Sequence, residues 1–170
     1  PTVTVKNAAD EILTEGDDYI VTYSDNTDAG IGKVTVIGAG QYYGLITKNF
    51  IIKPGKPKVG IKLYGHDDIQ GTWDAQPAGE GITMKYKVEY KRSTWDKYAL
   101  LSSAWSGISY KKANLVDGAR YRFKVTPYFE ADGEKYEGTP GYSSYIYTLK
   151  KIAAPRVSKS SRSYVRLRWT

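Results

Sequence analysis

Three aromatic residues are the strongest candidates for chemistry in this sequence of 170 residues. Trp95, Tyr98 and Trp105 lie in the long connection Arg92–Tyr110. Aromatic rings on loops can stack on sugar rings or anchor a protein partner. The alternative is that they pack over the edge of a sheet, because tryptophan side chains are usually largely buried. A ligand-binding role would require an exposed and coplanar pair among the three rings.

Residues suited to catalysis are sparse. Catalysis needs a nucleophile with a base, a carboxylate pair in a cleft, or a metal. The single histidine, His66, sits in a Tyr-Gly-His-Asp-Asp turn, and the chain has no cysteine. No Cys/His cluster has zinc-ligand spacing, no serine lies in a G-x-S-x-G turn, and no glycine-rich loop precedes a helix. We therefore expect no enzyme activity, no catalytic residue, no metal and no cofactor.

Acidic turns near the start of the chain could offer oxygen ligands to calcium. The candidates are Asp17, Asp18, Asp25, Asn26 and Asp28. Calcium is held by several carboxylate and carbonyl oxygens, but the spacing here matches no EF-hand loop. Asp and Asn also stabilise turns by bonding their own backbone. The sequence favours the turn role and leaves calcium binding open.

A Lys–Asn isopeptide cross-link would need a lysine, an asparagine and an acid buried together. Lys6, Asn49 and Glu11 are the conceivable partners. Buried lysine is rare, and Asn49 alternates outward beside Phe50 in a plain strand pattern. Solvated side chains are the favoured interpretation.

The elements that must position these residues are strands. Alternation runs over Thr2–Lys6, Tyr19–Tyr23, Lys33–Ile37 and Leu45–Ile52, with turn clusters of Gly, Asn and Asp between them. Sixteen tyrosines against three phenylalanines suit half-buried strands. The single helical candidate, Thr94–Ala104, is short and interrupted by paired serines. The pattern predicts an all-β fold of sandwiches.

Linkers that contain proline and a repeated pattern divide the chain. One linker is Lys53–Pro57, where two prolines and a glycine cannot pair into a central strand. A second lies at Leu149–Pro155, and the stretches Pro57–Trp73 and Pro155–Trp169 repeat a proline-led strand, a turn and a strand closing on tryptophan. The predicted domains are residues 1–52, 53–150 and 151–170.

The first domain carries a recognisable set of residues. They are Leu13-Thr-Glu-Gly16, Asp17-Asp-Tyr19-Ile-Val-Thr-Tyr23, Ala29-Gly30, Val34-Thr-Val36, Gly38-Ala-Gly40-Gln-Tyr42 and Phe50-Ile-Ile52. In their joint spacing they resemble a bacterial immunoglobulin-like repeat common in surface proteins of Gram-positive anaerobes. That resemblance implies a small β-sandwich and a further strand upstream of Pro1.

The second domain resembles a fibronectin type III domain. Trp73 stands where that fold has its core tryptophan, and Tyr86–Lys91 reads as its third strand. Leu115 and Tyr121 match the leucine and tyrosine of the corner before the sixth strand, where the tyrosine hydroxyl bonds nearby backbone. The resemblance implies tandem immunoglobulin-like and fibronectin type III-like sandwiches, with residues 151–170 as the first two strands of another such domain.

Charge and hydropathy limit the partners. The net charge is −4 over residues 1–52, +5 over residues 53–150 and +6 over residues 151–170. Basic residues that alternate with apolar ones in Tyr164–Trp169 are typical of the outer face of a strand, so we expect no nucleic acid partner. No run of about eighteen apolar residues occurs, so we expect no membrane insertion.

The function implied by these resemblances is structural. We expect a non-catalytic fragment of a bacterial cell-surface or secreted multidomain protein, extracellular in location, that acts as a spacer or adhesive scaffold. Its partners would be neighbouring domains and an unidentified protein or carbohydrate ligand. The alternative is a set of accessory modules, carbohydrate-binding or spacing, of a secreted polysaccharide-degrading enzyme. Residues 155–169 are expected to pair with the second domain or with another copy, as an effect of truncation.

Overall fold

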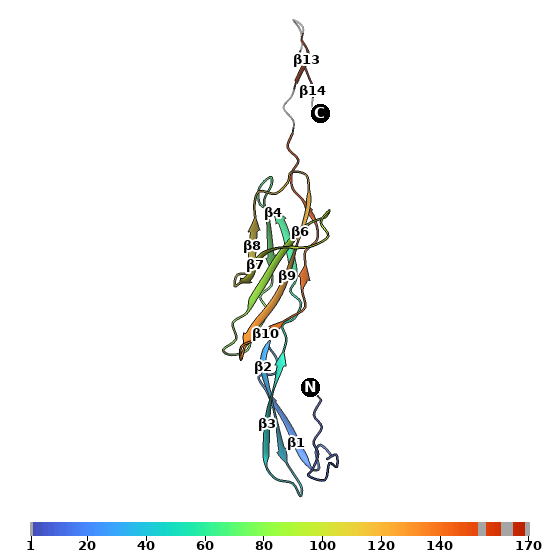
Figure 1. Cartoon of the computed structure of the whole chain (residues 1–170), viewed down its shortest axis with the longest axis vertical. Coiled ribbons are helices and arrows are strands. Elements are labelled where there is room, and N and C mark those ends of the chain that lie inside the picture. Colours follow the sequence, from blue (N-terminus) through green and yellow to red (C-terminus); the bar gives the residue numbers. More distant parts are fainter. Residues whose placement is uncertain (1, 153–155, 161–164, 169–170) are drawn as a thin grey trace.

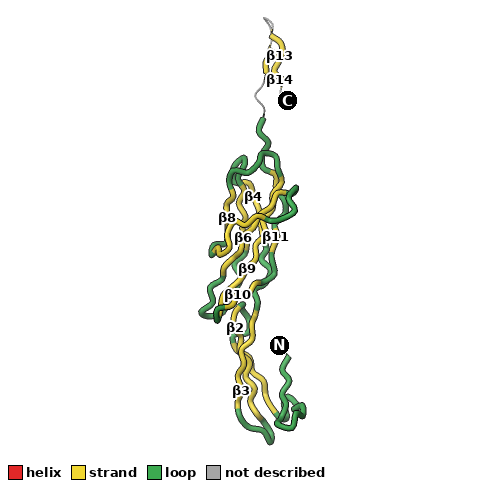
Figure 2. The backbone as a smooth tube through the Cα atoms, in the orientation of Figure 1, coloured by secondary structure: helices red, strands yellow, loops and turns green. Residues whose placement is uncertain are grey.

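The computed structural model describes residues 2–152, 156–160 and 165–168. Strands and loops make up the described residues, and no helix occurs among them (Figure 2). Accordingly, the described part of the chain contains no helix that is long and apolar enough to cross a membrane. The all-β expectation is confirmed.

Fourteen strands occur in the described residues and group into four sheets (Figure 1). In chain order they are β1 (Tyr19–Ser24), β2 (Gly30–Gly38), β3 (Leu45–Ile52), β4 (Val59–Leu63), β5 (Ile69–Trp73), β6 (Lys85–Arg92), β7 (Ala99–Trp105), β8 (Ser109–Lys112), β9 (Arg120–Ala131), β10 (Glu134–Glu137), β11 (Gly141–Tyr142), β12 (Ile146–Tyr147), β13 (Arg156–Ser160) and β14 (Val165–Arg168).

Residues 2–52, which we call the first unit, hold one antiparallel sheet in the order β1-β2-β3. The expected strand at Thr2–Lys6 is wrong: the segment makes one isolated bridge, between Lys6 and Ile12. Its valines instead line a groove with Val36 of β2 and Ile46 of β3. The alternation arises because one side of the segment faces the sheet, but the segment lacks the row of backbone hydrogen bonds that would make it a strand.

Strands β4 to β12 form a two-layer sandwich, which we call the middle unit. One layer is β4-β5-β8 and the other is β10-β9-β6-β7, with β11 and β12 also paired to β9. Alternate residues of β5, β6 and β9 point inward, as the period of two requires. The buried core consists of Ile69, Trp73, Tyr86, Val88, Leu115, Ala119, Tyr121, Phe123 and Val125.

The tyrosine corner predicted from the sequence closes this core. Tyr121 is 1% exposed, and the backbone N–H of Val116 donates to its hydroxyl oxygen at 3.2 Å. Leu115, immediately before, is also buried. The hydroxyl therefore satisfies the loop that leads into β9 while the ring fills the core.

The connection Arg92–Tyr110 is more ordered than the sequence indicated. Its middle forms strand β7, which pairs with β6 through two register irregularities. Leu101 packs against the core, whereas Leu100 is exposed. The paired serines and the irregular register hide the period of two, and this is why the strand escapes a pattern search.

Strands β13 and β14 pair with each other in a sheet of their own. Among the described strands they pair with nothing else, so the expected pairing with the middle unit is not found. Pairing with another copy stays a prediction. Pro155 and Trp169, which bound the expected strand pair, lie outside the described residues.

Candidate interaction surfaces

Trp95 lies over the edge of the core. It is 37% exposed, and its ring meets those of Tyr90 at 5.5 Å and Tyr121 at 6.3 Å, both edge-on. The turn that carries it is closed by the Trp95 N–H donating to the Arg92 carbonyl at 3.0 Å. Its ring packs against the middle unit and does not stand free.

Trp105 and Tyr98 each have a different neighbour. The Trp105 ring packs edge-on against Tyr110 at 4.9 Å, and its Nε1–H donates to the Ser109 carbonyl at 2.9 Å. Tyr98 packs against Tyr142 at 6.1 Å, and burial raises the pKa of its hydroxyl. Among the described ring contacts, none joins two of the residues Trp95, Tyr98 and Trp105, and each ring packs against other neighbours. The ligand-binding role of these three residues stays a prediction.

A second surface lies on the outer face of β9 and the short strands beside it. The Arg120 guanidinium lies over the rings of Tyr145 and Tyr147, at 5.1 Å from each centroid. The next outward residue, Arg122, lies over Tyr142 at 5.1 Å and Tyr145 at 5.0 Å. We call these residues, with Tyr98, the ladder.

Strand pairing explains why arginines and tyrosines lie beside one another on this face. Residues 120 and 122 are two apart on β9 and so share one face of the sheet. The antiparallel partners place Tyr147 opposite Arg120 and Tyr142 opposite Lys124, so tyrosines lie on both sides of Arg122. Arg122 also donates from Nη2 to the Ser143 carbonyl at 2.9 Å. Cation–π contacts of this kind hold the guanidinium groups in fixed orientations.

Lys124 continues the row beside the ladder but is already paired. Its Nζ lies 2.9 Å from a carboxylate oxygen of Glu89, directly across the strands, and Lys87 lies 3.5 Å from the other oxygen. Burial acts to lower the pKa of Lys124, but the hydrogen bond and charge of Glu89 outweigh it and raise that pKa. Lys124 therefore stays protonated, and the Glu89 carboxylate balances its charge.

Sequence reasoning missed the ladder, although one signal was present. Arg120, Arg122 and Lys124 alternate with apolar residues, and Tyr142, Tyr145 and Tyr147 follow about twenty residues later. An antiparallel pairing of these two segments would have placed the tyrosines beside the cations. The sequence pattern does not show which strands pair or in which register, and the ladder depends on both.

The sequence-based catalytic and metal candidates remain apart. His66 is in a turn, 75% exposed, with Nε2 3.4 Å from the Asp67 carboxylate. The Asp18 carboxylate accepts a hydrogen bond from the Thr14 N–H at 2.9 Å, and Asp25 lies 3.7 Å from Lys33. Among the described residues, no group of three or more His, Cys, Asp or Glu side chains is placed to hold a metal ion.

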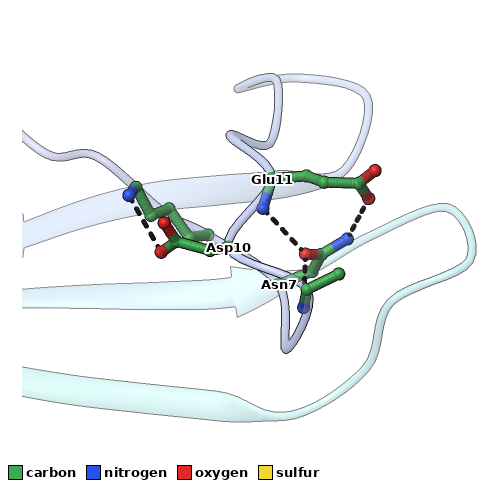
Figure 3. A network of polar contacts seen from close by, with 5 residues as sticks. Asn7, Asp10 and Glu11 are labelled. Atoms are coloured by element: carbon green, nitrogen blue, oxygen red, sulfur yellow. Dashed lines mark hydrogen bonds and ion pairs between the residues drawn. The ribbon is translucent and has the colours of Figure 1, made fainter.

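The conceivable isopeptide partners are likewise separate. Lys6 pairs with Asp10 at 2.9 Å, and Glu11 accepts from the Asn7 side chain at 2.7 Å (Figure 3). Asn7 in turn accepts from the N–H of Glu11 at 3.0 Å, which folds the chain back on itself. Asn49 is on β3, opposite Lys33 of β2. These contacts stabilise a turn and give no cross-link geometry.

A built contact joins the first unit to the middle unit. The Ala29 N–H donates to the Pro77 carbonyl at 3.3 Å, and the Gly79 N–H donates to the Ala29 carbonyl at 3.0 Å. Ala29 also forms an isolated parallel bridge with Ala78. Backbone bonds of this kind fix both the distance and the direction between two elements.

The proline linker takes part in the same contact. Pro54 and Pro57 are both buried. Gly138 and Gly141 lie so close that a Cβ on Gly138 would collide with the Pro54 carbonyl, and one on Gly141 with the Pro57 carbonyl. We call the Ala29 contacts, the two prolines and these two glycines the joint.

Comparisons with known proteins concern the fold. No protein-family model matches the chain. Among solved structures it is similar to titin domains A168–A170 (21% identity, TM-score 0.43, 86% of this chain and 53% of that one). It is also similar to a fourth fibronectin type III domain from human (26% identity, TM-score 0.45, 65% of this chain and 87% of that one). A third is a structure described as FN3tt mut (14% identity, TM-score 0.41, 58% of this chain and 100% of that one).

The chain spans about half the length of the titin fragment. With TM-scores below 0.5, the assignment of fold rests on the sheets themselves. A β4-β5-β8 layer facing a β7-β6-β9 layer, closed by the Tyr121 corner, is a fibronectin type III-like sandwich. Sandwiches of this class are commonly non-catalytic spacer or interaction modules.

Proposed function

We propose that the chain is a structural and adhesive part of a bacterial cell-surface or secreted multidomain protein. In this role its folded units set the reach and direction of the chain, and chemistry is left to other parts of that protein. Its extracellular location is part of the proposal and is supported by the first-unit sequence motifs.

The joint is the observation that carries this proposal. Neighbouring domains move relative to each other by default unless the contact between them is substantial. Here the Ala29 backbone bonds and the buried Pro54 and Pro57 connect the units at two places. Two attachments restrict bending as well as twisting, which is the property that a spacer needs.

Pulsed electron spin resonance can test the stiffness directly. The chain has no cysteine, so Lys48→Cys on β3 and Lys62→Cys on β4 give two specific spin labels on exposed positions. We expect one narrow distance distribution between the labels. Replacing both Pro54 and Pro57 by glycine should broaden it, because glycine frees the linker backbone.

A pair of glycines in the exposed loop between β6 and β7, Asp96→Gly with Lys97→Gly, is the matched control, since it frees loop backbone outside the joint. The control should leave the distribution narrow. A native distribution as broad as that of the double glycine variant would remove the support for a stiff spacer. Glycan and matrix-protein arrays probed with the chain test the adhesive part, and no binding of the native chain would argue against it. Trp105→Ala tests whether the Trp105 ring carries any binding that is found.

A further inference from the structure

We propose that the ladder binds an acidic polysaccharide, one that carries carboxylates along an extended sugar chain. This goes beyond a spacer role, because it assigns a ligand class to one face of the middle unit. The ladder consists of Tyr98, Arg120, Arg122, Tyr142, Tyr145 and Tyr147.

The first argument is unneutralised charge. Three carboxylates of this sheet are already occupied: Glu89 pairs with Lys124, Glu130 with Lys85, and Glu137 with Lys135. Glu134 on β10 lies opposite Ala131, toward the other end of β9 from Arg120 and Arg122. Among the described residues, Arg120 and Arg122 have no carboxylate partner. Tyrosine rings lie beside both guanidinium groups and fix them in place. A surface that holds charged donors ready for an absent acid is complementary to an anion.

The second argument is geometry. Residues two apart on a strand are separated by about 6.7 Å, so Arg120 and Arg122 form a row along β9. Tyr145 contacts both arginines, and Tyr142 and Tyr147 continue the row on either side. The surface is thus a strip that follows the strand direction. Such a strip fits an extended polymer that repeats its charge better than a compact small molecule.

The third argument concerns the chemistry of the partner. Arginine and tyrosine are also enriched in protein interfaces, but those interfaces have a fully buried apolar centre. The ladder contains no aliphatic residue, and two charged groups occupy its centre. Tyrosine hydroxyls and guanidinium N–H groups are the donors and acceptors that suit sugar hydroxyls and carboxylates.

The fourth argument separates it from a nucleic acid. Binding of single strands relies on aromatic faces that are open for base stacking. In the ladder, a guanidinium lies over the rings of Tyr142, Tyr145 and Tyr147. The arginines occupy the places that bases would need. Arg120 is exposed and keeps its N–H groups for a ligand, whereas Arg122 has a buried Nε and a Nη2 that donates to the Ser143 carbonyl, so it offers its remaining N–H groups.

Binding of polygalacturonate to the whole chain tests the proposal, with the fully methyl-esterified polymer as a neutral probe of the same backbone. We expect binding of the acidic form alone, weakening as salt is raised. Arg120→Gln should weaken it by about tenfold, because it removes one charge-assisted contact. Arg120 is exposed, so the variant should keep the native melting temperature.

Lys111→Gln is the matched control. Lys111 also lies over a tyrosine, Tyr64 at 3.3 Å, but on the other layer of the sandwich. It should bind polygalacturonate like the native chain. Equal losses in the two variants would show an effect of net charge alone and overturn the proposal.

Three other results would also overturn it. These are no binding of the native chain, equal binding of the methyl-esterified polymer, or binding of polyglutamate or single-stranded DNA as tight as that of polygalacturonate. The last would assign the ladder to acidic chains of another class. None of these results depends on the stiffness of the joint, so the spacer proposal is tested separately.

Discussion

Trp73 fills the centre of the middle unit, yet its indole Nε1–H has no hydrogen-bond partner among the described residues. The side chain is 4% exposed and packs against Tyr86 at a ring distance of 5.6 Å. A buried donor without a partner costs free energy, roughly 1–3 kcal/mol. The Trp73 ring therefore stabilises the core through its buried apolar area and its packing. The unpaired Nε1–H offsets part of that stabilisation.

Two substitutions at Trp73 separate these contributions. Trp73→Ala should lower the free energy of unfolding by about 3–5 kcal/mol, since it empties a large buried volume. Trp73→Phe keeps most of the apolar ring and removes the unpaired N–H, so we expect a loss of about 1–2 kcal/mol or less. Urea unfolding measures both, and equal losses would contradict a leading role for ring area, because phenylalanine keeps most of the ring.

The Lys85–Glu130 pair gives a pH-dependent prediction at a single residue. Its two charged atoms lie 2.7 Å apart, and the hydrogen bond from Lys85, followed by its charge, lowers the pKa of the Glu130 carboxyl. Lys85→Gln should raise that pKa toward the ordinary value for glutamate. Carboxyl carbon shifts followed by NMR during an acid titration report it directly.

The sign of the stability effect follows from the lowered pKa. A carboxyl with a lower pKa in the folded state stabilises the fold above its unfolded pKa, and this is lost as pH falls through the folded pKa. The native chain and Lys85→Gln should therefore differ most near neutral pH and converge in acid. Glu137, whose pKa is lowered by the hydrogen bond from Lys135, should titrate identically in both. A shift of Glu137 as large as that of Glu130 would point to a general effect of the lost charge.

At the scale of elements, strand β5 needs glycine where it crosses β9. A Cβ built on Gly71 would come within 2.8 Å of the Phe123 ring, and Phe123 is fully buried. Gly71→Ala should therefore lower the free energy of unfolding by about 1–3 kcal/mol through overpacking. Thermal or urea unfolding checks this.

Gly60 on the neighbouring strand β4 is the matched control. A Cβ there would meet the Thr72 side-chain oxygen at 3.0 Å and the Thr72 carbonyl oxygen at 3.8 Å, and both residues are exposed. Gly60→Ala should be neutral or stabilise by up to about 1 kcal/mol, because alanine restricts the unfolded chain. If both variants lost the same stability, the cause would be strand backbone and not the contact with Phe123.

Strands with strict alternation could be predicted from the sequence, and irregular ones could not. Alternation of residue types located β1, β2 and β3, although burial follows it only in part, since the first five residues of β3 are all exposed. It failed at β7, where two register irregularities break the period, and at Thr2–Lys6, where an alternating segment lies on a sheet without joining it. The ladder escaped because it depends on which strands are neighbours, and β9 takes its partners from far along the chain.

At the scale of the whole molecule, the two units divide their properties unequally. The first unit is acidic and the middle unit basic, with net charges of −4 over residues 1–52 and +5 over residues 53–150. Apolar burial is equally uneven. Of the thirteen buried hydrophobic residues in the described part of the chain, only Tyr19 and Ala29 belong to the first unit. Ala29 is itself part of the joint, so one of those two depends on the contact with the middle unit.

This imbalance predicts the order in which the units open. Local stability follows buried apolar contacts, and regions with few of them exchange their amide hydrogens first. We expect amides of β1, β2 and β3 to exchange faster than those of β6 and β9. The β2–β3 and β6–β9 pairings are of similar length, so hydrogen bonding alone would predict similar protection of their amides. Hydrogen–deuterium exchange read by mass spectrometry resolves the two sets.

The joint should make this order sensitive to the linker. Substituting glycine for both Pro54 and Pro57 loosens the attachment and should speed exchange in β1 to β3 further, while β6 and β9 keep their native protection. The control with Asp96→Gly and Lys97→Gly should change neither set. Equal protection of both units in the native chain would mean that the joint transmits the stability of the middle unit across the boundary, so that the two open as one. Only unequal protection fits a stiff contact that sets direction while each unit keeps its own core.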